Sequence, residues 1–176
     1  MPALREVNGM KLYLMRHGLA ANLGAGGVTR DSARPLTPKG ERRVEEIAQA
    51  LQRLELDFDV ILTSPLLRAR QTAEIVADTL GLRQHLHVSA HLAVPPDSPK
   101  LVQQINGLRP RPGSVLLVGH EPHLSEFAGW LIAGEPGPAI TFKKGGLARL
   151  DARILEAGRC ASLVWLLPPR LLRRLG

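Results

Sequence analysis

Cysteine is nearly absent from this chain of 176 residues, in which Cys160 is the only one. An internal disulfide is therefore excluded, as is a zinc site built from several cysteines. No arginine stands six positions after Cys160, so the pattern of cysteine-dependent phosphatases is missing too. We expect Cys160 to be a small packed residue rather than a nucleophile.

Aromatic residues are scarce, at 3% of the chain, which leaves few rings to stack on unpaired bases. Apolar runs are short, and none approaches the roughly 20 residues that a membrane-spanning helix needs. Residues 1–6 also lack the continuous apolar stretch of a secretory signal. We therefore expect a cytoplasmic protein that has neither nucleic acid nor a membrane as its partner.

Acidic residues are outnumbered: Lys and Arg total 23 against 16 Asp and Glu, which gives a formal net charge of +7. Such a balance admits nucleic acid or acidic surfaces as partners. The cations are scattered, however, and only Arg170, Arg173 and Arg174 form a dense group. We interpret the charge as a solvated, Arg-rich surface. Nucleic-acid binding is an alternative that rests on charge alone.

The chain does contain enough apolar material for a core, since 44% of its 176 residues are hydrophobic. No internal repeat, low-complexity segment or linker divides it. We predict a single domain over residues 10–176, preceded by an N-terminal extension over residues 1–9. Met10 is an alternative starting methionine.

Short apolar runs alternate along the chain with segments of helical periodicity. Helices are predicted between the runs, with start signals at Thr37-Pro38 and Ser64-Pro65 and a stop at Gly81. This alternation indicates an α/β fold: a three-layer sandwich with a mostly parallel central sheet flanked by helices on both faces. The predicted strands, of which the last two are antiparallel, are residues 11–15, 60–63, 86–88, 114–118, 146–152 and 162–167.

Cationic and imidazole side chains follow three of the predicted strands. Arg16 and His17 come directly after the first strand, Ser64 and then Arg68 after the second, and His120 after the fourth. Open α/β sheets bind ligands beyond the carboxyl ends of their strands, so we expect these residues to meet at one edge. No cluster of carboxylates accompanies them. Because guanidinium groups match phosphate oxygens in pairs, the sequence predicts an oxyanion site with phosphate as the leading ligand.

Arg68 and His17 each have a second interpretation. Arg68 lies in the first turn of its helix, where a cation is disfavoured unless an anion sits between it and the helix terminus. Taken alone it also fits an arginine whose head reaches solvent, as we expect for Arg70. A lone histidine at a strand end is usually structural, but His17 precedes Gly18, which lets the backbone approach a ligand closely. If a backbone carbonyl accepts from one ring nitrogen, the other is free to attack phosphorus without a metal.

Two further patterns have weaker interpretations. Residues 57–59, Asp-Phe-Asp, resemble the paired aspartates of magnesium-dependent phosphatases, but they precede their strand and so belong at the opposite edge of the sheet. The spacings His120-x-x-His123 and His85-x-His87 resemble metal sites. Neither has a carboxylate or cysteine partner at a suitable spacing. We therefore expect no metal and no cofactor.

Three ordered motifs resemble the histidine phosphatase superfamily: LMRHG at residues 14–18, SPLLRARQTA at residues 64–73 and GHEP at residues 119–122. The stretch DSARPLT at residues 31–37, with Gly40 after it, is similar to the SixA-like phosphohistidine phosphatase branch. Together the motifs and their spacing cover nearly the whole chain. The resemblance implies a phosphoglycerate mutase-like fold.

The resemblance also implies roles for the residues at the strand ends. His17 is then the nucleophile that becomes phosphorylated, and Arg16, Arg68 and His120 bind the phosphoryl oxygens. The implied substrate is phosphohistidine on a partner protein. A small-molecule phosphomonoesterase and a phospho-ligand binding module without turnover remain as alternatives. The oligomeric state is not predicted.

The general acid of the wider superfamily has no clear counterpart. Many phosphomonoesterase members carry a Glu in the loop after the third strand, and that loop, residues 91–99, offers only Asp97. Glu121 is another candidate, which either orients His120 or begins the following helix. Phosphohistidine leaves as an imidazole, a better leaving group than an alkoxide. The missing acid therefore favours a substrate with an N–P bond.

Overall fold

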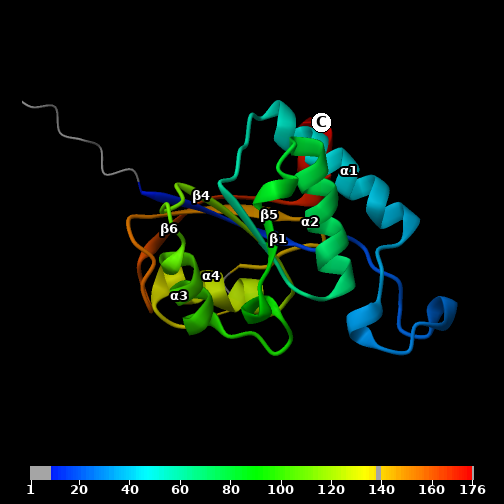
Figure 1. Ribbon diagram of the computed structural model, residues 1–176, viewed down its shortest axis with the longest axis horizontal. Helices are drawn as coiled ribbons and strands as arrows, with labels where there is room; N and C mark the ends of the chain where they lie inside the picture. Colours follow the sequence, from blue (N-terminus) through cyan, green and yellow to red (C-terminus); the bar gives the residue numbers. More distant parts are fainter. Residues whose placement is uncertain (1–8, 138–139, 176) are drawn as a thin grey trace, which may run out of the picture.

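The computed structural model describes residues 9–137 and 140–175, so the predicted extension over residues 1–9 lies, apart from Gly9, outside the described part. Within the described part, six strands form one sheet in the order β3-β2-β4-β1-β5-β6 (Figure 1). The neighbours from β3 to β1 pair in parallel, whereas β5 is antiparallel to β1 and β6 is antiparallel to β5. The predicted mostly parallel sheet is confirmed, as is its antiparallel final pair. The strands are β1 (Met10–Arg16), β2 (Val60–Thr63), β3 (Leu86–Val88), β4 (Ser114–Gly119), β5 (Leu147–Ala152) and β6 (Ala161–Leu167).

Helices cover both faces of this sheet. α1, α2 and α5 lie on one face and α3 and α4 on the other (Figure 1). The three-layer α/β sandwich predicted from the sequence is therefore confirmed. The helices are α1 (Pro38–Arg53), α2 (Leu67–Leu80), α3 (Ser98–Gly107), α4 (His123–Ala133) and α5 (Pro169–Leu175), and the short 3-10 turns are η1 (Ala25–Gly27), η2 (Asp31–Ala33), η3 (Arg83–His85) and η4 (Ala90–Leu92).

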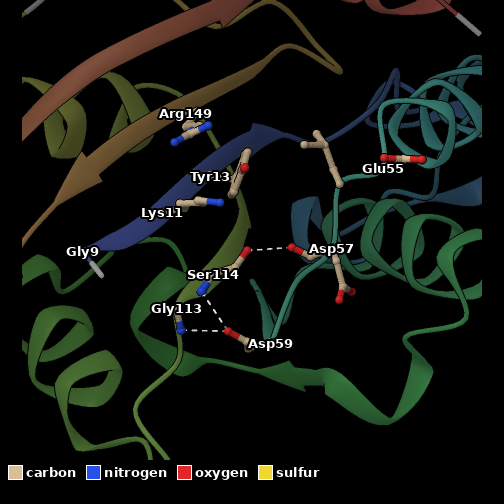
Figure 2. A pocket seen from close by; sticks show the side chains of 10 residues that line it. Gly9, Lys11, Tyr13, Glu55, Asp57, Asp59, Gly113, Ser114 and Arg149 are labelled. Atoms are coloured by element: carbon tan, nitrogen blue, oxygen red, sulfur yellow. Dashed lines mark hydrogen bonds between the residues drawn. The ribbon is translucent and has the colours of Figure 1, made fainter. Parts of the chain in front are cut away.

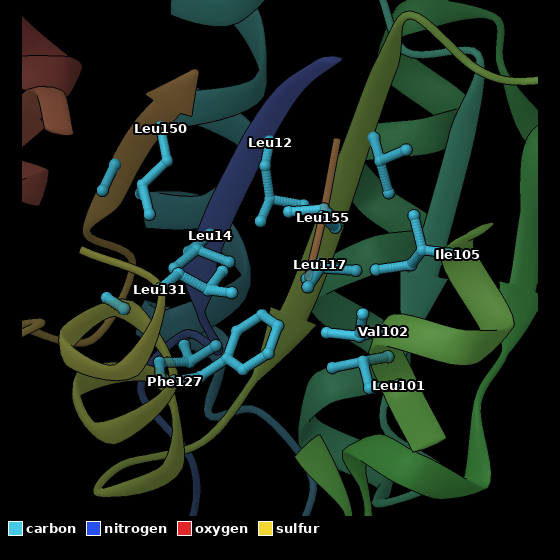
Figure 3. Packing of buried hydrophobic residues seen from close by; sticks show 14 of the residues in the cluster. Leu12, Leu14, Leu101, Val102, Ile105, Leu117, Phe127, Leu131, Leu150 and Leu155 are labelled. Carbon is cyan, nitrogen blue, oxygen red and sulfur yellow. The ribbon is translucent and has the colours of Figure 1, made fainter. Parts of the chain in front are cut away.

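Two apolar cores hold the three layers together. Leu12 and Leu14 of β1 belong to the core beneath α3 and α4, where Phe127 also lies (Figure 3). Tyr13 and Met15, at the alternating positions, belong to the core beneath α1, α2 and α5. Successive side chains of a strand point to opposite faces of the sheet. The unbroken apolar runs of the central strands follow from having helices on both sides.

The two predicted helix starts have different outcomes. Thr37 caps α1 as expected, because its Oγ1 accepts a hydrogen bond from the backbone N–H of Gly40 at 3.0 Å. The start predicted at Ser64-Pro65 is wrong, since α2 begins at Leu67. Ser64 still continues the strand ladder, donating its N–H to the Val118 carbonyl at 3.0 Å. Its hydroxyl accepts a hydrogen bond from the Leu66 N–H at 3.3 Å and also contacts the site described below.

Gly40 allows α1 to lie directly against the backbone that leaves β1. A Cβ atom at this position would collide with the backbone carbonyl oxygen of Leu19, because the two atoms would lie much closer than van der Waals contact allows. We expect Gly40→Ala to lower the free energy of unfolding by about 1–3 kcal/mol, because neither backbone can yield easily. Urea unfolding measures this change. Gly107→Ala is the matched control, since a Cβ at this helical glycine meets nothing within 4 Å and should leave stability equal or slightly higher. Equal effects of the two substitutions would contradict the packing argument.

Candidate active site

The carboxyl ends of three neighbouring strands bring the predicted site residues to one edge of the sheet. β2, β4 and β1 are adjacent and parallel. The backbone N–H of His17 bonds to the Gly119 carbonyl at 3.1 Å, which aligns the end of β1 with that of β4. Arg16, His17, Ser64 and His120 therefore emerge side by side, as expected for a binding site at the crossover point of a parallel sheet.

The imidazole of His17 is buried, with 5% exposure, and both of its nitrogens are engaged. Nδ1 lies 2.7 Å from the Gly18 carbonyl oxygen, which can only accept, so Nδ1 carries the proton. The Arg68 Nε–H donates to His17 Nε2 at 3.2 Å, which requires a lone pair on Nε2. Burial lowers the pKa of His17 to about 3, and the charges of Arg68 and Arg16 act in the same direction. The ring is therefore neutral at pH 7, with Nε2 unprotonated.

Gly18 fixes this ring by its small size rather than by unusual backbone angles. A Cβ on Gly18 would lie 2.6 Å from Val44 Cγ2 of α1, so the turn could not approach the helix. The Gly18 N–H donates to Thr72 Oγ1 at 3.0 Å, and that hydroxyl donates to the Arg68 carbonyl at 2.7 Å. The turn after β1 is thus fastened to the first turns of α2.

Arg68 lies in the first turn of α2 with 6% exposure, which rules out the solvent-reaching interpretation. Its Nη1 donates to the Asp31 carbonyl at 2.8 Å and its Nη2 to Asp31 Oδ2 at 3.0 Å. Asp31 also accepts from Arg34 at 2.8 Å, and hydrogen bonds from Arg34 and then Arg68 lower the pKa of its carboxyl. Arg70 is exposed and forms an ion pair with Glu74, as expected for a surface residue.

Asp31 is a residue of this site for which the sequence motifs predict no role, although the sequence contains a signal. It is the only acidic residue between Arg16 and Glu41. A single carboxylate in a basic stretch is a candidate counter-ion for a buried guanidinium. In the structure it holds Arg68 with its side chain aimed at His17.

Arg16 is held from the opposite side by the loop that leads into β5. Its Nη1 donates to the Phe142 carbonyl at 2.8 Å, and the Arg16 carbonyl accepts from the Gly145 N–H at 3.0 Å. Glu121 braces the same loop, since its Oε1 accepts from the Phe142 N–H at 2.7 Å. The other Glu121 oxygen accepts from Ser125 Oγ at 2.6 Å in the first turn of α4. Of the two roles predicted for Glu121, the structure shows the one at the start of the helix, and in the described part of the chain its carboxylate makes no hydrogen bond to His120.

His120 faces His17 across the site. The two ring centroids are 5.1 Å apart with an interplanar angle of 54°, and His120 is 4% exposed. His120 Nε2 lies 2.7 Å from Ser64 Oγ, a contact that the prediction of Ser64 as a helix cap overlooked. Burial lowers the pKa of His120 to about 4, with Arg68 contributing in the same direction. His120 is therefore a neutral ring whose orientation depends on Ser64.

Two buried nitrogens at this site have no partner among the described residues, namely Arg16 Nε and His120 Nδ1. Leaving buried polar groups unpaired costs free energy, so such atoms call for a ligand or water. Arg68 shares the Asp31 carboxylate with Arg34, and Arg16 forms no ion pair among the described residues. An oxyanion between Arg16 and Arg68 would accept from both guanidinium groups, which is the chemistry that the sequence predicts for phosphate.

The other acidic candidates lie elsewhere. Asp97 caps α3, accepting from the backbone N–H of Lys100 at 3.0 Å, and pairs with the Lys100 ammonium group at 3.1 Å. In the part of the chain that the structure describes, it makes no hydrogen bond to His17 or His120. Its carboxylate is used for the helix, so the structure gives no support to Asp97 as a general acid.

The aspartates of residues 57–59 lie at the opposite edge of the sheet, as predicted. They border a cavity of about 450 Å³ that is also lined by Tyr13, Lys11 and Arg149 (Figure 2). Asp59 Oδ2 accepts from the backbone N–H groups of Gly113 and Ser114 at 2.7 and 2.9 Å. This carboxylate therefore fixes the start of β4, at the end of the sheet opposite the candidate active site.

The histidine spacings that resemble metal sites do not gather further ligands. His123 Nε2 contacts Ser98 Oγ at 3.0 Å, and His85 Nδ1 contacts the Asp59 carbonyl at 2.9 Å. Over residues 9–137 and 140–175, no group of three His, Cys, Asp or Glu side chains is placed to hold a metal ion. Among the helices of the described residues, none combines the length and the apolar character that a membrane span requires.

Acid should destabilise the fold through its buried histidines. The pKa values of His17, His120 and His123 are lowered by burial to about 3, 4 and 4, from 6.5 for an exposed imidazole. The unfolded chain then binds more protons below pH 6.5, so stability is fully present above that pH and is lost as the pH falls. Between pH 6.5 and 4.5 we expect a loss of up to about 2 kcal/mol per histidine in the free energy of unfolding.

Urea unfolding at the two pH values measures this loss. His123→Phe, which keeps a ring beside Phe127, should remove about a third of the histidine contribution. His87→Gln is the control, because His87 is exposed and its replacement should leave the pH dependence unchanged. A pH dependence that is the same in His123→Phe as in the unchanged chain would contradict the assignment.

Comparison with known proteins places this site in a class. The sequence profile of the histidine phosphatase superfamily (branch 1) matches residues 12–92. The phosphohistidine phosphatase SixA of Escherichia coli (strain K12) is 33% identical over 133 residues, which cover 75% of this chain and 80% of SixA. The chain therefore belongs to the histidine phosphatase superfamily, in its SixA-like branch, and is a hydrolase of the phosphatase type.

Two further similarities extend over nearly the full length. An uncharacterised protein of Picosynechococcus sp. is 41% identical over 168 residues, covering 90% of this chain and 100% of that protein. The structure of the protein histidine phosphatase SixA complexed with tungstate aligns with a TM-score of 0.78 and 30% identity, covering 93% of this chain and 99% of that one. The phosphoglycerate mutase-like fold implied by the sequence motifs is thereby confirmed.

Proposed function

We propose that this chain hydrolyses phosphohistidine on a partner protein through a phosphorylated His17. The observation that carries the proposal is the state of the His17 ring. Nδ1–H is bonded to the Gly18 carbonyl, and Nε2 keeps its lone pair next to Arg68. A neutral imidazole in this position is a nucleophile that needs no metal to activate it.

In the first step the Arg68 Nε–H shifts its hydrogen bond from His17 Nε2 to a phosphoryl oxygen. The Nε2 lone pair then attacks phosphorus, and a His17 N–P bond forms as the substrate N–P bond breaks. Arg16, Arg68 and His120 surround the phosphoryl oxygens, so that charge is neutralised while PO₃ is transferred. In the second step water attacks phosphorus, the His17 N–P bond breaks and inorganic phosphate leaves. The proton stays on His17 Nδ1 in both steps and is donated in a hydrogen bond to the Gly18 carbonyl.

The lack of a general acid supports the choice of substrate. An alkoxide leaving group needs a proton, and Asp97 and Glu121 are both engaged in structural hydrogen bonds. A phosphohistidine whose second ring nitrogen carries a proton departs as a neutral imidazole and needs none. The two SixA relatives, described as a phosphohistidine phosphatase and a protein histidine phosphatase, point to the same substrate class.

Trapping the intermediate tests the proposal. The enzyme is mixed with a ³²P-labelled phosphohistidine peptide and quenched in alkali, in which phosphohistidine survives, and the label is mapped to one residue. We expect one label, on His17, and activity that EDTA leaves intact and vanadate inhibits. Label on another residue, or loss of activity with EDTA, would contradict the mechanism. A strong preference for phosphate esters over phosphoramidates would favour a small-molecule phosphomonoesterase instead.

A further inference from the structure

A small cavity lies next to the turn that carries His17. It measures about 130 Å³ and is enclosed by that turn, α1, α5 and the loop before β5. Its charged lining consists of Arg43, Lys144 and Arg173, and no carboxylate lines it within the described part of the chain. The cavity is therefore strongly cationic, although it is separate from Arg16 and Arg68.

The cations of this cavity are incompletely neutralised. Neither Arg43 nor Lys144 forms an ion pair among the described residues. Arg173 Nη1 pairs with Glu46 at 3.2 Å, but Arg173 Nε is buried and has no partner in the described part. A buried donor without a partner is costly. An anion in the cavity would offset part of the charge of Arg43 and Lys144, which have no ion-pair partner among the described residues.

Lys144 joins this cavity to the candidate active site. It stands directly before Gly145, whose N–H bonds to the Arg16 carbonyl at 3.0 Å. Its pKa is lowered by burial and by the nearby charges of Arg16, Arg34 and Arg68. Gly18, which follows His17, also lines the cavity. The cavity and the candidate active site therefore share the turn at Gly18 and the loop at Lys144 and Gly145.

We propose that this cavity is a second oxyanion subsite, which takes the carboxylate of an acidic side chain flanking the phosphohistidine of the substrate protein. The inference rests on the proposed function, since it describes the same substrate. A volume of about 130 Å³ is below the roughly 300–1,000 Å³ of pockets for drug-sized ligands, so the cavity suits one small group. A free inorganic anion offers the same chemistry, and the experiment below separates the two sources.

Two synthetic phosphohistidine peptides that differ only in flanking Glu or Gln residues test the subsite. We expect the unchanged enzyme to favour the Glu peptide by about tenfold in kcat/KM, the effect of one charge-assisted hydrogen bond. Arg43→Gln should reduce this preference to about threefold or less, mainly through KM. Arg43→Lys keeps the charge and should keep most of the preference. Arg42→Gln is the matched control, because Arg42 is exposed on the same helix, does not line the cavity and should leave the tenfold preference unchanged.

A second readout does not depend on turnover. The ¹H–¹⁵N signal of Arg173 Nε is followed while the unphosphorylated Glu peptide, or sulfate, is added. We expect the Glu peptide to shift this signal in the unchanged enzyme and not in Arg43→Gln. Equal kcat/KM for the two peptides overturns the proposal, and a sulfate shift without a peptide preference assigns the cavity to a free anion instead. If neither phosphopeptide is hydrolysed, the proposed function fails, and the shift with the Glu peptide alone decides for or against the subsite.

Discussion

Replacement of His17 by alanine is expected to lower kcat by about 10⁴-fold or more, because the nucleophile itself is removed. The fold should persist, since the Gly18 N–H keeps its bond to Thr72 and the strand ladder is unaffected. Steady-state kinetics with a phosphohistidine peptide measure the loss, and the labelled enzyme intermediate should disappear. Vanadate binding should weaken far less than turnover, because Arg16, Arg68 and His120 remain.

Added imidazole gives this prediction a specific form. The His17 ring is 5% exposed, so its removal leaves a hole of the size and shape of imidazole beside Arg68 Nε. Millimolar imidazole should restore part of the activity and release free phosphoimidazole. His87→Ala, which removes an exposed ring, is the control and should neither lose activity nor respond to imidazole. Full activity of His17→Ala would contradict the assignment of His17 as the nucleophile.

Replacement of Arg68 by glutamine should cost about 10²–10³-fold in kcat/KM, the usual effect of removing one preorganised charged donor. Arg68 has two functions at once. Its Nε–H holds His17 Nε2 in the unprotonated form, and its charge faces the site. Arg68→Lys keeps the charge but loses the planar group that reaches both His17 and Asp31, so we expect it to recover only part of the activity.

Two variants separate these contributions. Arg70→Gln, two residues further along α2, removes an exposed arginine paired with Glu74 and should leave kcat/KM unchanged. Asp31→Asn weakens one of the two hydrogen bonds that Arg68 donates to Asp31 and leaves the one to the carbonyl in place, so a loss of about tenfold is expected. If Arg68→Gln retained normal kinetics, the arginine would serve only the packing of α2.

The sequence predicts those site residues whose positions follow from the few residues next to them in the chain. Arg16, His17 and His120 directly follow apolar strands, and a parallel sheet brings such ends together whatever the rest of the chain does. The alternation of Leu12, Tyr13 and Leu14 between two cores follows from the same strand geometry. Fold class and oxyanion chemistry therefore follow from short sequence patterns.

The supporting contacts are not encoded in this way. His120 meets Ser64 across 56 residues, and Arg16 meets Phe142 across 126. These pairs depend on how loops are folded back over the strand ends, which no periodicity reports. Ser-Pro is a valid helix start, but at Ser64 the strand ladder overrides that local preference and α2 begins at Leu67. The role of Glu121 cannot be read locally either, since its partner Phe142 lies in a loop of irregular structure.

The reversal of strand direction between β1 and β5 separates two kinds of segment around the phosphoryl group. The parallel strands deliver residues at their exits, where position is dictated by the ladder. The segment of residues 140–146 instead reaches the site on its way into the sheet, and hydrogen bonds at Phe142, Gly145 and Gly146 anchor it. Substitutions between those anchors should therefore change the surface beside the site while the residues at the strand ends keep their positions.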